Sequence, residues 1–209
     1  GLQSLSIGTV MSHPVELFGY PVLGRLGDGA ARTIYRIRNP QSGEEHALKH
    51  VVKRGEKDQR FIDQLVDEQR IGARLSHTSI RRIGKLLRKR RKFRVAEVGL
   101  IMEYVDAPGL DTMQGKTLLE NIRIFTRIAE GLHSMHQAGI VHTDIKPTNV
   151  LVDDSVVKII DLGQACPIGT TKGRIQGTPG YIAPEQAHRR RITERTDVYN
   201  LGATMHWVL

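Results

Sequence analysis

Side chains that could handle phosphate and a divalent cation are concentrated in one stretch of the sequence. Asp144, Lys146 and Asn149 lie close together, and Asp161 follows directly behind a short apolar segment. Carboxylate and amide oxygens are hard ligands of the kind that Mg²⁺ prefers. Moving a phosphoryl group needs cations to neutralise its charge and a carboxylate to orient the attacking hydroxyl. Residues of these types are all present here, although a polar turn between a helix and a strand would also fit them.

A glycine-rich turn near the start of the chain could bind phosphate. It consists of Leu26, Gly27, Asp28 and Gly29, with Ile34 in the strand-like segment that follows. Because glycine has no Cβ, backbone amides in such a turn can approach a phosphate closely. Taken alone, the turn fits an ordinary hairpin as well.

A lysine and a glutamate occupy positions where a single charge would be costly. Ala47 precedes Lys49 in an apolar strand-like segment, and Glu68 lies on the apolar stripe of a predicted helix beside Leu65. A buried charge is unfavourable unless it is paired. Each residue alone would fit an edge position, but together they predict an ion pair.

The first half of the chain reads as a small sheet with one helix. Strand patterns run through residues 22–52, a helix is predicted over 61–75, and residues 80–105 are predicted to form a hairpin whose second strand is 98–102. Residues 1–20 show no clear periodicity and are interpreted as an N-terminal extension, in which Met11 could be the natural start.

The second half reads as mainly helical and begins after a break at residues 107–109. Short apolar segments follow at 150–152 and 157–160, then a Gly/Thr-rich loop at 163–180 and a helix that begins near Asp197 and still runs at Leu209. A long amphipathic helix precedes them, with a predicted stripe of Leu118, Ile122, Phe125, Ala129, Leu132 and His136. The pattern predicts an α+β fold.

Six ordered motifs resemble those of the eukaryotic-like (Hanks-type) Ser/Thr protein kinases, from Val22 onward. The glycine-rich turn is similar to G-x-G-x-x-G-x-V, with Arg32 at the third glycine, and residues 47–49 with Glu68 resemble the family's Lys–Glu pair. Residues 142–149 resemble the catalytic loop H-R-D-x-K-x-x-N, and 161–163 resemble D-F-G with Leu162 for Phe. Residues 177–185 resemble the end of the activation segment, and 197–202 the start of the helix that anchors the large lobe.

The resemblance implies a two-lobed fold that binds ATP and Mg²⁺, with an N-lobe at 21–105 and a C-lobe at 106–209 that is truncated after the start of its central helix. Asp144 would orient the substrate hydroxyl and Lys146 would offset charge on the γ-phosphate. Asn149 and Asp161 would hold magnesium. The implied ATP-binding residues are Leu26, Gly27, Asp28, Gly29, Ile34, Ala47, Lys49, Glu68, Met102 at the back of the adenine pocket, and Glu103 and Val105 in the hinge.

Two details of the resemblance favour transfer to Ser or Thr of protein substrates. These are Lys146 within D-x-K-P-x-N and Thr178 before A-P-E. Thr143 stands where the family's arginine pairs with a phosphorylated activation loop, so loop phosphorylation should matter little. The alternatives are a pseudokinase or scaffold of the same fold, which the intact motif residues disfavour, and a small-molecule phosphotransferase, which the A-P-E segment at 183–185 disfavours.

The formal net charge of +9 is concentrated in residues 81–94 and 189–191. These runs would fit solvated surfaces or a docking surface for acidic proteins or lipid headgroups, and scarce aromatics nearby disfavour nucleic acid. A lone cysteine, Cys166, suits a reducing compartment. No apolar run reaches the roughly 18 residues of a membrane span, and no signal peptide is evident. We therefore expect a cytoplasmic protein, with an anchor after Leu209 left open.

Overall fold

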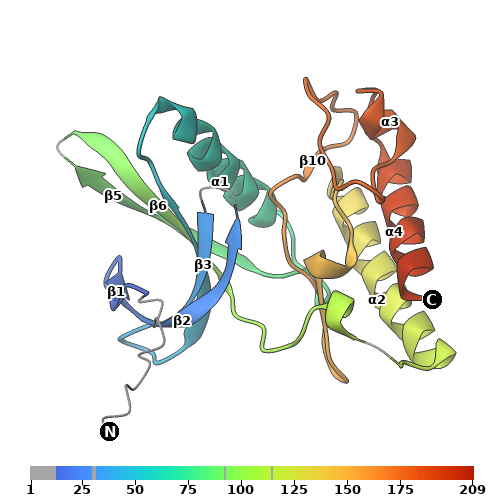
Figure 1. Ribbon diagram of the computed structural model, residues 1–209, viewed down its shortest axis with the longest axis horizontal. Coiled ribbons are helices and arrows are strands. Elements are labelled where there is room, and N and C mark those ends of the chain that lie inside the picture. The colour runs from blue at the N-terminus through green and yellow to red at the C-terminus, as the bar shows by residue number, and fades with distance from the viewer. Residues whose placement is uncertain (1–12, 30–31, 92, 114) are drawn as a thin grey trace, which may run out of the picture.

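The chain forms two lobes, a sheet with one helix and a mainly helical lobe, as the α+β prediction required (Figure 1). The structure is a computed structural model that describes residues 13–29, 32–91, 93–113 and 115–209. Met11, considered above as a start, lies outside the described residues. The predicted lobe boundary at residue 105 stays a prediction; the chain crosses from one lobe to the other through residues 104–109.

The first lobe contains a six-stranded antiparallel sheet in the order β1-β2-β3-β4-β6-β5. The strands are β1 (Glu16–Leu17), β2 (Tyr20–Gly29), β3 (Arg32–Arg38), β4 (Glu45–Val52), β5 (Ile83–Arg91) and β6 (Arg94–Glu103). Strand β1 lies within the stretch interpreted as an extension and pairs with β2. The second strand of the predicted hairpin is longer than expected, because β6 continues the ladder outward to Arg94.

The turn between β3 and β4 follows from its residue types. The side chain of Asn39 accepts hydrogen bonds from the backbone N–H groups of Gln41 and Ser42, at 2.9 and 3.3 Å. Gly43 adopts φ +73°, which glycine tolerates without a Cβ clash. This turn sets the register that places Lys49 opposite Ile34.

One helix, α1 (Gln59–Gly72), packs on the sheet after a 3-10 turn at Glu56–Asp58. It begins two residues before the predicted start, and its buried face carries Ile62, Leu65, Glu68 and Gly72. A Cβ on Gly72 would lie 2.3 Å from Cγ1 of Ile83, so glycine is required for the close approach of α1 and β5. Glu68 is therefore buried because it lies on the face of α1 that packs against the sheet.

The long helix of the second lobe is α2 (Leu118–Gln137). It begins there because Thr117 caps it: Thr117 Oγ1 accepts the N–H of Glu120, and Glu120 Oε2 accepts the N–H of Thr117. The predicted apolar stripe is wrong at three positions, since Leu118 and Ile122 are 67% and 54% exposed and Ala129 is exposed as well. The buried face is rotated and consists of Asn121, Ile124, Phe125, Ile128, Gly131, Leu132 and Met135.

Short elements complete the second lobe. They are the 3-10 turns Leu110–Thr112 and Pro147–Asn149, the strands β7 (Ile140–Val141), β8 (Val150–Val152), β9 (Val157–Ile159) and β10 (Cys166–Pro167), and the helices α3 (Pro184–Ala187) and α4 (Glu194–Val208). Helix α4 begins three residues before the predicted Asp197 and ends at Val208. Strands β8 and β9 form an antiparallel hairpin, and β7 pairs with β10.

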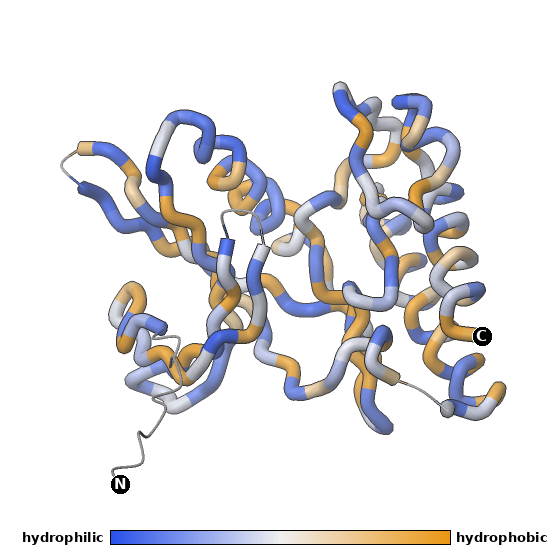
Figure 2. Tube along the Cα trace, in the orientation of Figure 1, coloured by the Kyte–Doolittle hydropathy of each residue, from blue (hydrophilic) through white to orange (hydrophobic). Residues whose placement is uncertain are grey.

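Apolar residues recur along the strands of the sheet and along the helices of the other lobe (Figure 2). The largest cluster of buried apolar side chains forms around α2, β8 and β9, and a second one lies between the sheet and α1. Within the described ranges, no helix combines the length and the apolar character that crossing a bilayer requires.

Candidate active site

The first lobe contains an ion pair that the sequence predicted. Lys49 Nζ in β4 lies 2.7 and 2.8 Å from the two carboxylate oxygens of Glu68 in α1. Both side chains are almost fully buried, at 2% and 0% exposed. Burial alone would lower the pKa of Lys49, but Glu68 and Asp161 outweigh it and the pKa is raised. The ammonium thus stays charged at the floor of the cleft.

Asp161 connects this pair to the second lobe. Its Oδ1 accepts hydrogen bonds from Lys49 Nζ at 3.1 Å and from the N–H of Gly163 at 3.0 Å, and Arg32 Nη2 lies 3.6 Å from its Oδ2. Burial would raise the pKa of Asp161, but Lys49, Arg32 and the Gly163 N–H hold it well below its usual range. The carboxylate is therefore ionised at neutral pH.

The hairpin β8–β9 explains why Asn149 and Asp161 meet although twelve positions separate them. Asn149 immediately precedes β8, and a single residue, Ile160, separates the end of β9 from Asp161. The N–H of Ile160 donates to the carbonyl of Asn149 at 3.0 Å. The side-chain nitrogen of Asn149 donates to the carbonyl and to Oδ2 of Asp144, at 2.8 and 3.2 Å. Three of the predicted site residues are thus brought together by one tight hairpin.

Asp144, Lys146 and Thr178 form a closed triangle of polar contacts. Thr178 Oγ1 donates to Asp144 Oδ1 at 2.9 Å, Lys146 Nζ donates to Thr178 Oγ1 at 2.7 Å, and Lys146 Nζ lies 3.3 Å from Asp144 Oδ2. These residues come from the loop after β7 and from the segment 163–180. The contacts fix the orientation of the Asp144 carboxylate.

The loop that carries Asp144 is held from behind by Asp197, the fourth residue of α4. Asp197 Oδ2 accepts the N–H of His142 at 2.9 Å, and its Oδ1 accepts the N–H of Thr143 at 2.8 Å. The side chain of Asp197 is fully buried, and His136 Nε2 lies 2.8 Å from its Oδ2. Helix α4 therefore positions the loop through main-chain bonds.

The oxygen atoms in the cleft fit a magnesium ion. The amide nitrogen of Asn149 is occupied by Asp144, and no hydrogen bond to its Oδ1 is found among the described residues. Asp161 Oδ2 accepts no close hydrogen bond there either, since Arg32 is 3.6 Å away. An amide and a carboxylate oxygen on adjacent strand ends are the hard ligands that Mg²⁺ takes together with substrate phosphates.

The predicted adenine-binding residues lie at the sheet end of the cleft. Ala47 in β4 pairs with Met102 in β6, and both are buried. The side chain of Glu103 accepts hydrogen bonds from the N–H of Arg82 and from Lys158 Nζ, so it is occupied within the protein. Val105 lies in the connection between the lobes.

The glycine-rich turn forms the end of the β2–β3 hairpin. Gly27 pairs with Ile34 and Gly29 with Arg32, while Leu26 is 45% exposed. The carboxylate of Asp28 forms an ion pair with Arg25 and accepts a hydrogen bond from Thr33. The polar contacts of Asp28 thus stay within the hairpin, although its side chain is 52% exposed.

Several contacting residues were missed by sequence reasoning. Gln64 Nε2 donates to the carbonyl of Gly163 at 2.7 Å and so ties α1 to the loop of Asp161. It lies one helical turn before Glu68 on the same face, a spacing that could have indicated it. Arg81 had been assigned to the basic run 81–94, but it is only 7% exposed and its Nε has no hydrogen-bond partner among the described residues.

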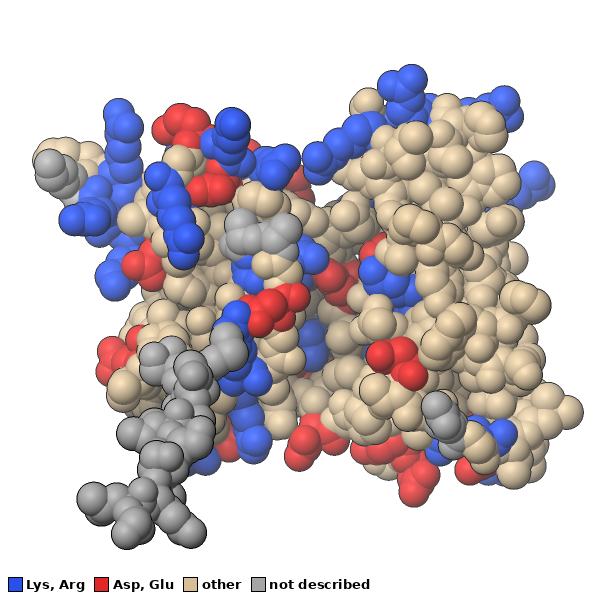
Figure 3. Space-filling model, in the orientation of Figure 1, with Lys and Arg blue, Asp and Glu red and all other residues tan. Residues whose placement is uncertain are grey.

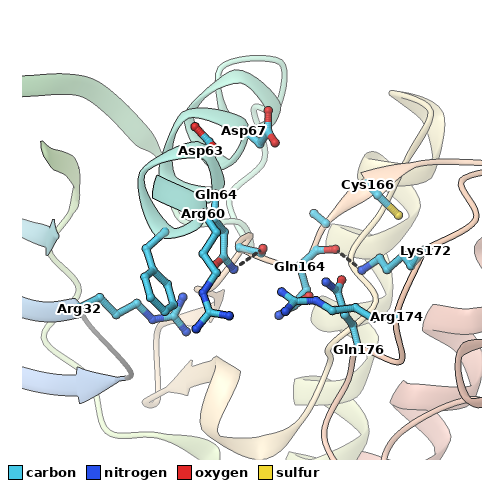
Figure 4. Close-up of a pocket in the computed structure, with 13 residues that line it drawn as sticks. Arg32, Arg60, Asp63, Gln64, Asp67, Gln164, Cys166, Lys172, Arg174 and Gln176 are labelled. Carbon is cyan, nitrogen blue, oxygen red and sulfur yellow. Dashed lines mark hydrogen bonds between the residues drawn. The ribbon is translucent and has the colours of Figure 1, made fainter. Parts of the chain in front are cut away.

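A cavity of about 600 Å³ lies beside the site, between α1 and the segment 163–176. Figure 4 shows Arg60 on α1 and Arg174 on that segment directed toward the same space, with Lys172 bonded to Gln164 at its edge. None of the predicted site residues lines this cavity. The cavity flanks the cleft that contains Lys49 and Asp144.

The order and spacing of these groups match a known family. The family model described as the protein kinase domain matches residues 20–209. The chain belongs to the protein kinase family. The two-lobed fold and the family resemblance of the motifs are thereby confirmed.

Relatives of this kinase domain carry consistent names. It is 32% identical over 201 residues to the serine/threonine-protein kinase AfsK of Streptomyces griseus, covering 92% of this chain and 24% of that protein. It is 29% identical to the serine/threonine-protein kinase PknJ of Mycobacterium tuberculosis, covering 99% and 35%. It is 31% identical to mitogen-activated protein kinase kinase 7 of Arabidopsis thaliana, covering 93% and 63%. The chain thus spans a quarter to a third of these two bacterial relatives.

Proposed function

We propose that this kinase domain transfers the γ-phosphate of ATP to Ser or Thr hydroxyls of protein substrates, as an enzyme of the EC 2.7.11.1 type. The observation that carries the proposal is the polar assembly in the cleft, where Lys49, Asp144 and Asp161 are each held by at least two polar contacts of 2.7 to 3.3 Å. Groups fixed in this way can stabilise charge in the transition state without reorganising.

Asp144 accepts the proton of the substrate hydroxyl in this proposal. The hydroxyl oxygen bonds to the γ-phosphorus, the bond from that phosphorus to the bridging oxygen breaks, and ADP leaves with the electron pair. Lys146, 3.3 Å from Asp144, offsets the charge of the transferred group. Lys49, held by Glu68, contacts the α- and β-phosphates.

Asn149 and Asp161 would hold magnesium. The ion, when bound, neutralises charge on the phosphates. The backbone of Gly27 and Gly29 covers the phosphates from above, while Leu26, Ile34 and Ala47 enclose the nucleotide. Met102 closes the adenine pocket, and backbone groups from Glu103 to Val105 bond the base.

The contacts of Thr178 support Ser and Thr as acceptors. Its hydroxyl donates to Asp144 and accepts from Lys146, so the threonine five positions before the A-P-E segment directly contacts the proposed catalytic pair. The relatives named above are consistent with this substrate class.

A transfer assay with γ-labelled ATP, Mg²⁺ and a generic basic protein tests the proposal. We expect label on the protein, on Ser or Thr after acid hydrolysis, and none with the Asp144→Asn variant. Nucleotide binding without transfer would instead indicate a pseudokinase. Label found only on a small molecule would indicate a small-molecule phosphotransferase.

We also propose an acidic protein partner for the basic hairpin and a cytoplasmic location. Figure 3 shows Lys and Arg side chains gathered over the end of β5 and β6. Arg88, Arg90 and Arg91 are exposed there, and β5 is an edge strand of the sheet. Replacing these three with Gln should weaken the binding of an acidic protein and reduce its salt dependence.

A further inference from the structure

The segment 163–180 is tied to the catalytic loop by a lysine of its own. Lys172 Nζ donates to Thr143 Oγ1 at 2.9 Å and to the backbone carbonyl of Gln164 at 2.7 Å. Thr143 Oγ1 in turn donates to that same carbonyl at 2.9 Å. One ammonium therefore ties the middle of the segment to its own start, three residues after Asp161, and to the residue beside Asp144.

Thr143 is shaped to receive this contact. It is 1% exposed and has φ +69°, a left-handed conformation that a β-branched residue adopts only under constraint. Its N–H donates to Asp197, and its carbonyl accepts from Gln186 Nε2 at 2.7 Å. With its hydroxyl bonded to Lys172 and Gln164, every polar group of Thr143 is used.

The position of Lys172 is unusual for a lysine. Its side chain is partly buried, and no carboxylate lies within 4.0 Å of Nζ among the described residues. Burial lowers its pKa, while Cys166, Asp144 and Asp197 act in the opposite direction. A lysine placed without an ion-pair partner costs free energy. That cost is offset where the ammonium fixes the position of backbone that the site needs.

We propose that Lys172 is a positioning residue that holds the segment 163–180 in its transfer-competent arrangement without a phosphate. The expected effect on the transfer rate rests on the proposed kinase function. The effect on the order of the segment does not depend on that function. A phosphorylated loop uses an anion on the segment and a cation on the catalytic loop. Here the cation is on the segment, and its acceptors are Thr143 on the catalytic loop and Gln164 at the start of the segment itself.

Lys172→Met tests this, because methionine keeps most of the aliphatic stem and removes the ammonium. Hydrogen exchange of the full chain should show the amides of residues 164–176 exchanging at least roughly tenfold faster than in the unaltered chain. Arg174→Met is the matched control, since Arg174 lies on the same segment and has no hydrogen bond or ion pair to the described residues; exchange should not change.

Rates supply the second readout. The kcat of Lys172→Met should fall roughly tenfold while the KM for ATP stays within about twofold, because the substituted residue does not contact the nucleotide. Thr143→Val should act similarly, and the double variant should be little worse than either single one. Exchange that matches the unaltered chain, or a loss confined to the KM for ATP, would overturn the proposal. If the unaltered chain transfers no phosphate, the proposed function fails, and the exchange result still decides the role of Lys172.

Discussion

At the residue scale, the two aspartates of the cleft have different surroundings, so substitutions at the two positions should have different effects on activity and on nucleotide binding. Asp144 contacts Thr178, Lys146 and Asn149, whereas Asp161 contacts Lys49 and the N–H of Gly163. The first set surrounds the carboxylate that accepts the proton of the substrate hydroxyl in the proposed reaction. The second set lies where phosphates and magnesium would bind.

We predict that Asp144→Asn and Asp161→Asn each lower the transfer rate by about 100- to 1000-fold, the usual cost of removing one fixed electrostatic group. Asp144→Asn should keep the affinity for MgATP, because in the proposed reaction Asp144 acts on the substrate hydroxyl and not on MgATP. Asp161→Asn should weaken it, because a magnesium ligand is lost. Calorimetric titration of both variants with MgATP checks the difference, and equal affinities would contradict the assigned roles.

Sequence reasoning identified Lys49 and Glu68 because each charge was conspicuous in an apolar pattern. It could not connect Lys172 to Thr143, because the two lie 29 positions apart in loops that have no periodicity. Arg81 shows the opposite error: a basic run suggested exposure, but the chain turns inward there before β5 begins. A charged residue can be predicted as buried from the sequence only where the apolar residues around it follow the periodicity of a strand or a helix.

At the element scale, helix α2 shows where periodicity was insufficient. Spacings of three and four recur on two of its faces, since Ile122 and Leu118 follow the same pattern as Ile128 and Ile124. Only packing against β7 and β9 selects the buried face, and these strands lie later in the chain. The existence and length of the helix were predictable, but its rotation was not.

We predict that Ile128→Ala lowers the free energy of unfolding by about 2–5 kcal/mol, because Ile128 is fully buried and its removal leaves a cavity. Ile122→Ala, the same change one turn and a half earlier on the exposed face, should cost less than about 0.5 kcal/mol. Urea unfolding of the two variants measures both values. Similar costs would mean that the face of α2 is assigned wrongly.

The segment 163–180 should need no phosphate on its threonines. Thr170 Oγ1 donates to the carbonyl of Pro167, the backbone of Thr171 pairs with that of Arg191, and no hydrogen bond joins either hydroxyl to the catalytic loop among the described residues. The double variant Thr170→Ala, Thr171→Ala should therefore retain activity within about tenfold, equivalent to roughly 1.4 kcal/mol of barrier. A steady-state transfer assay decides it; a larger loss would show that modification of these residues is required.

At the scale of the whole molecule, two buried histidines should make stability depend on pH. Burial lowers the pKa of His142 and of His50 from 6.5 in the fold. The folded chain then binds fewer protons than the unfolded one as the pH falls through that range. Their contribution to stability is present above about pH 6.5 and is lost below it.

We predict that the free energy of unfolding decreases on the order of 1 kcal/mol between pH 7.5 and 5.5. Urea titrations at the two pH values measure the change. His50→Gln should reduce the difference, because one of the two groups is removed. A stability that is constant over this interval in the unaltered chain would contradict the prediction.

The arrangement of the lobes was predictable in outline only. Motif order placed a sheet before a helical unit, but the contact of Lys49 with Asp161 joins residues 112 positions apart across the cleft. Gln64, which bonds Gly163, adds a second connection between the lobes. Such contacts depend on how far the lobes close, which no local pattern in the sequence encodes.

The bond between Lys172 and Thr143 also constrains how this domain could evolve. An arginine introduced at position 143 would bring a second cation against the ammonium of Lys172, and like charges at contact distance repel. Replacing Lys172 first would remove the tie before anything had taken its place. If Lys172 has the proposed role, we expect the two positions to be epistatic, because each single substitution would lower activity and only the joint change would lead to control by a phosphorylated loop. A lineage that carries this pair could therefore reach that mode of regulation only through an intermediate with one substitution and lower activity.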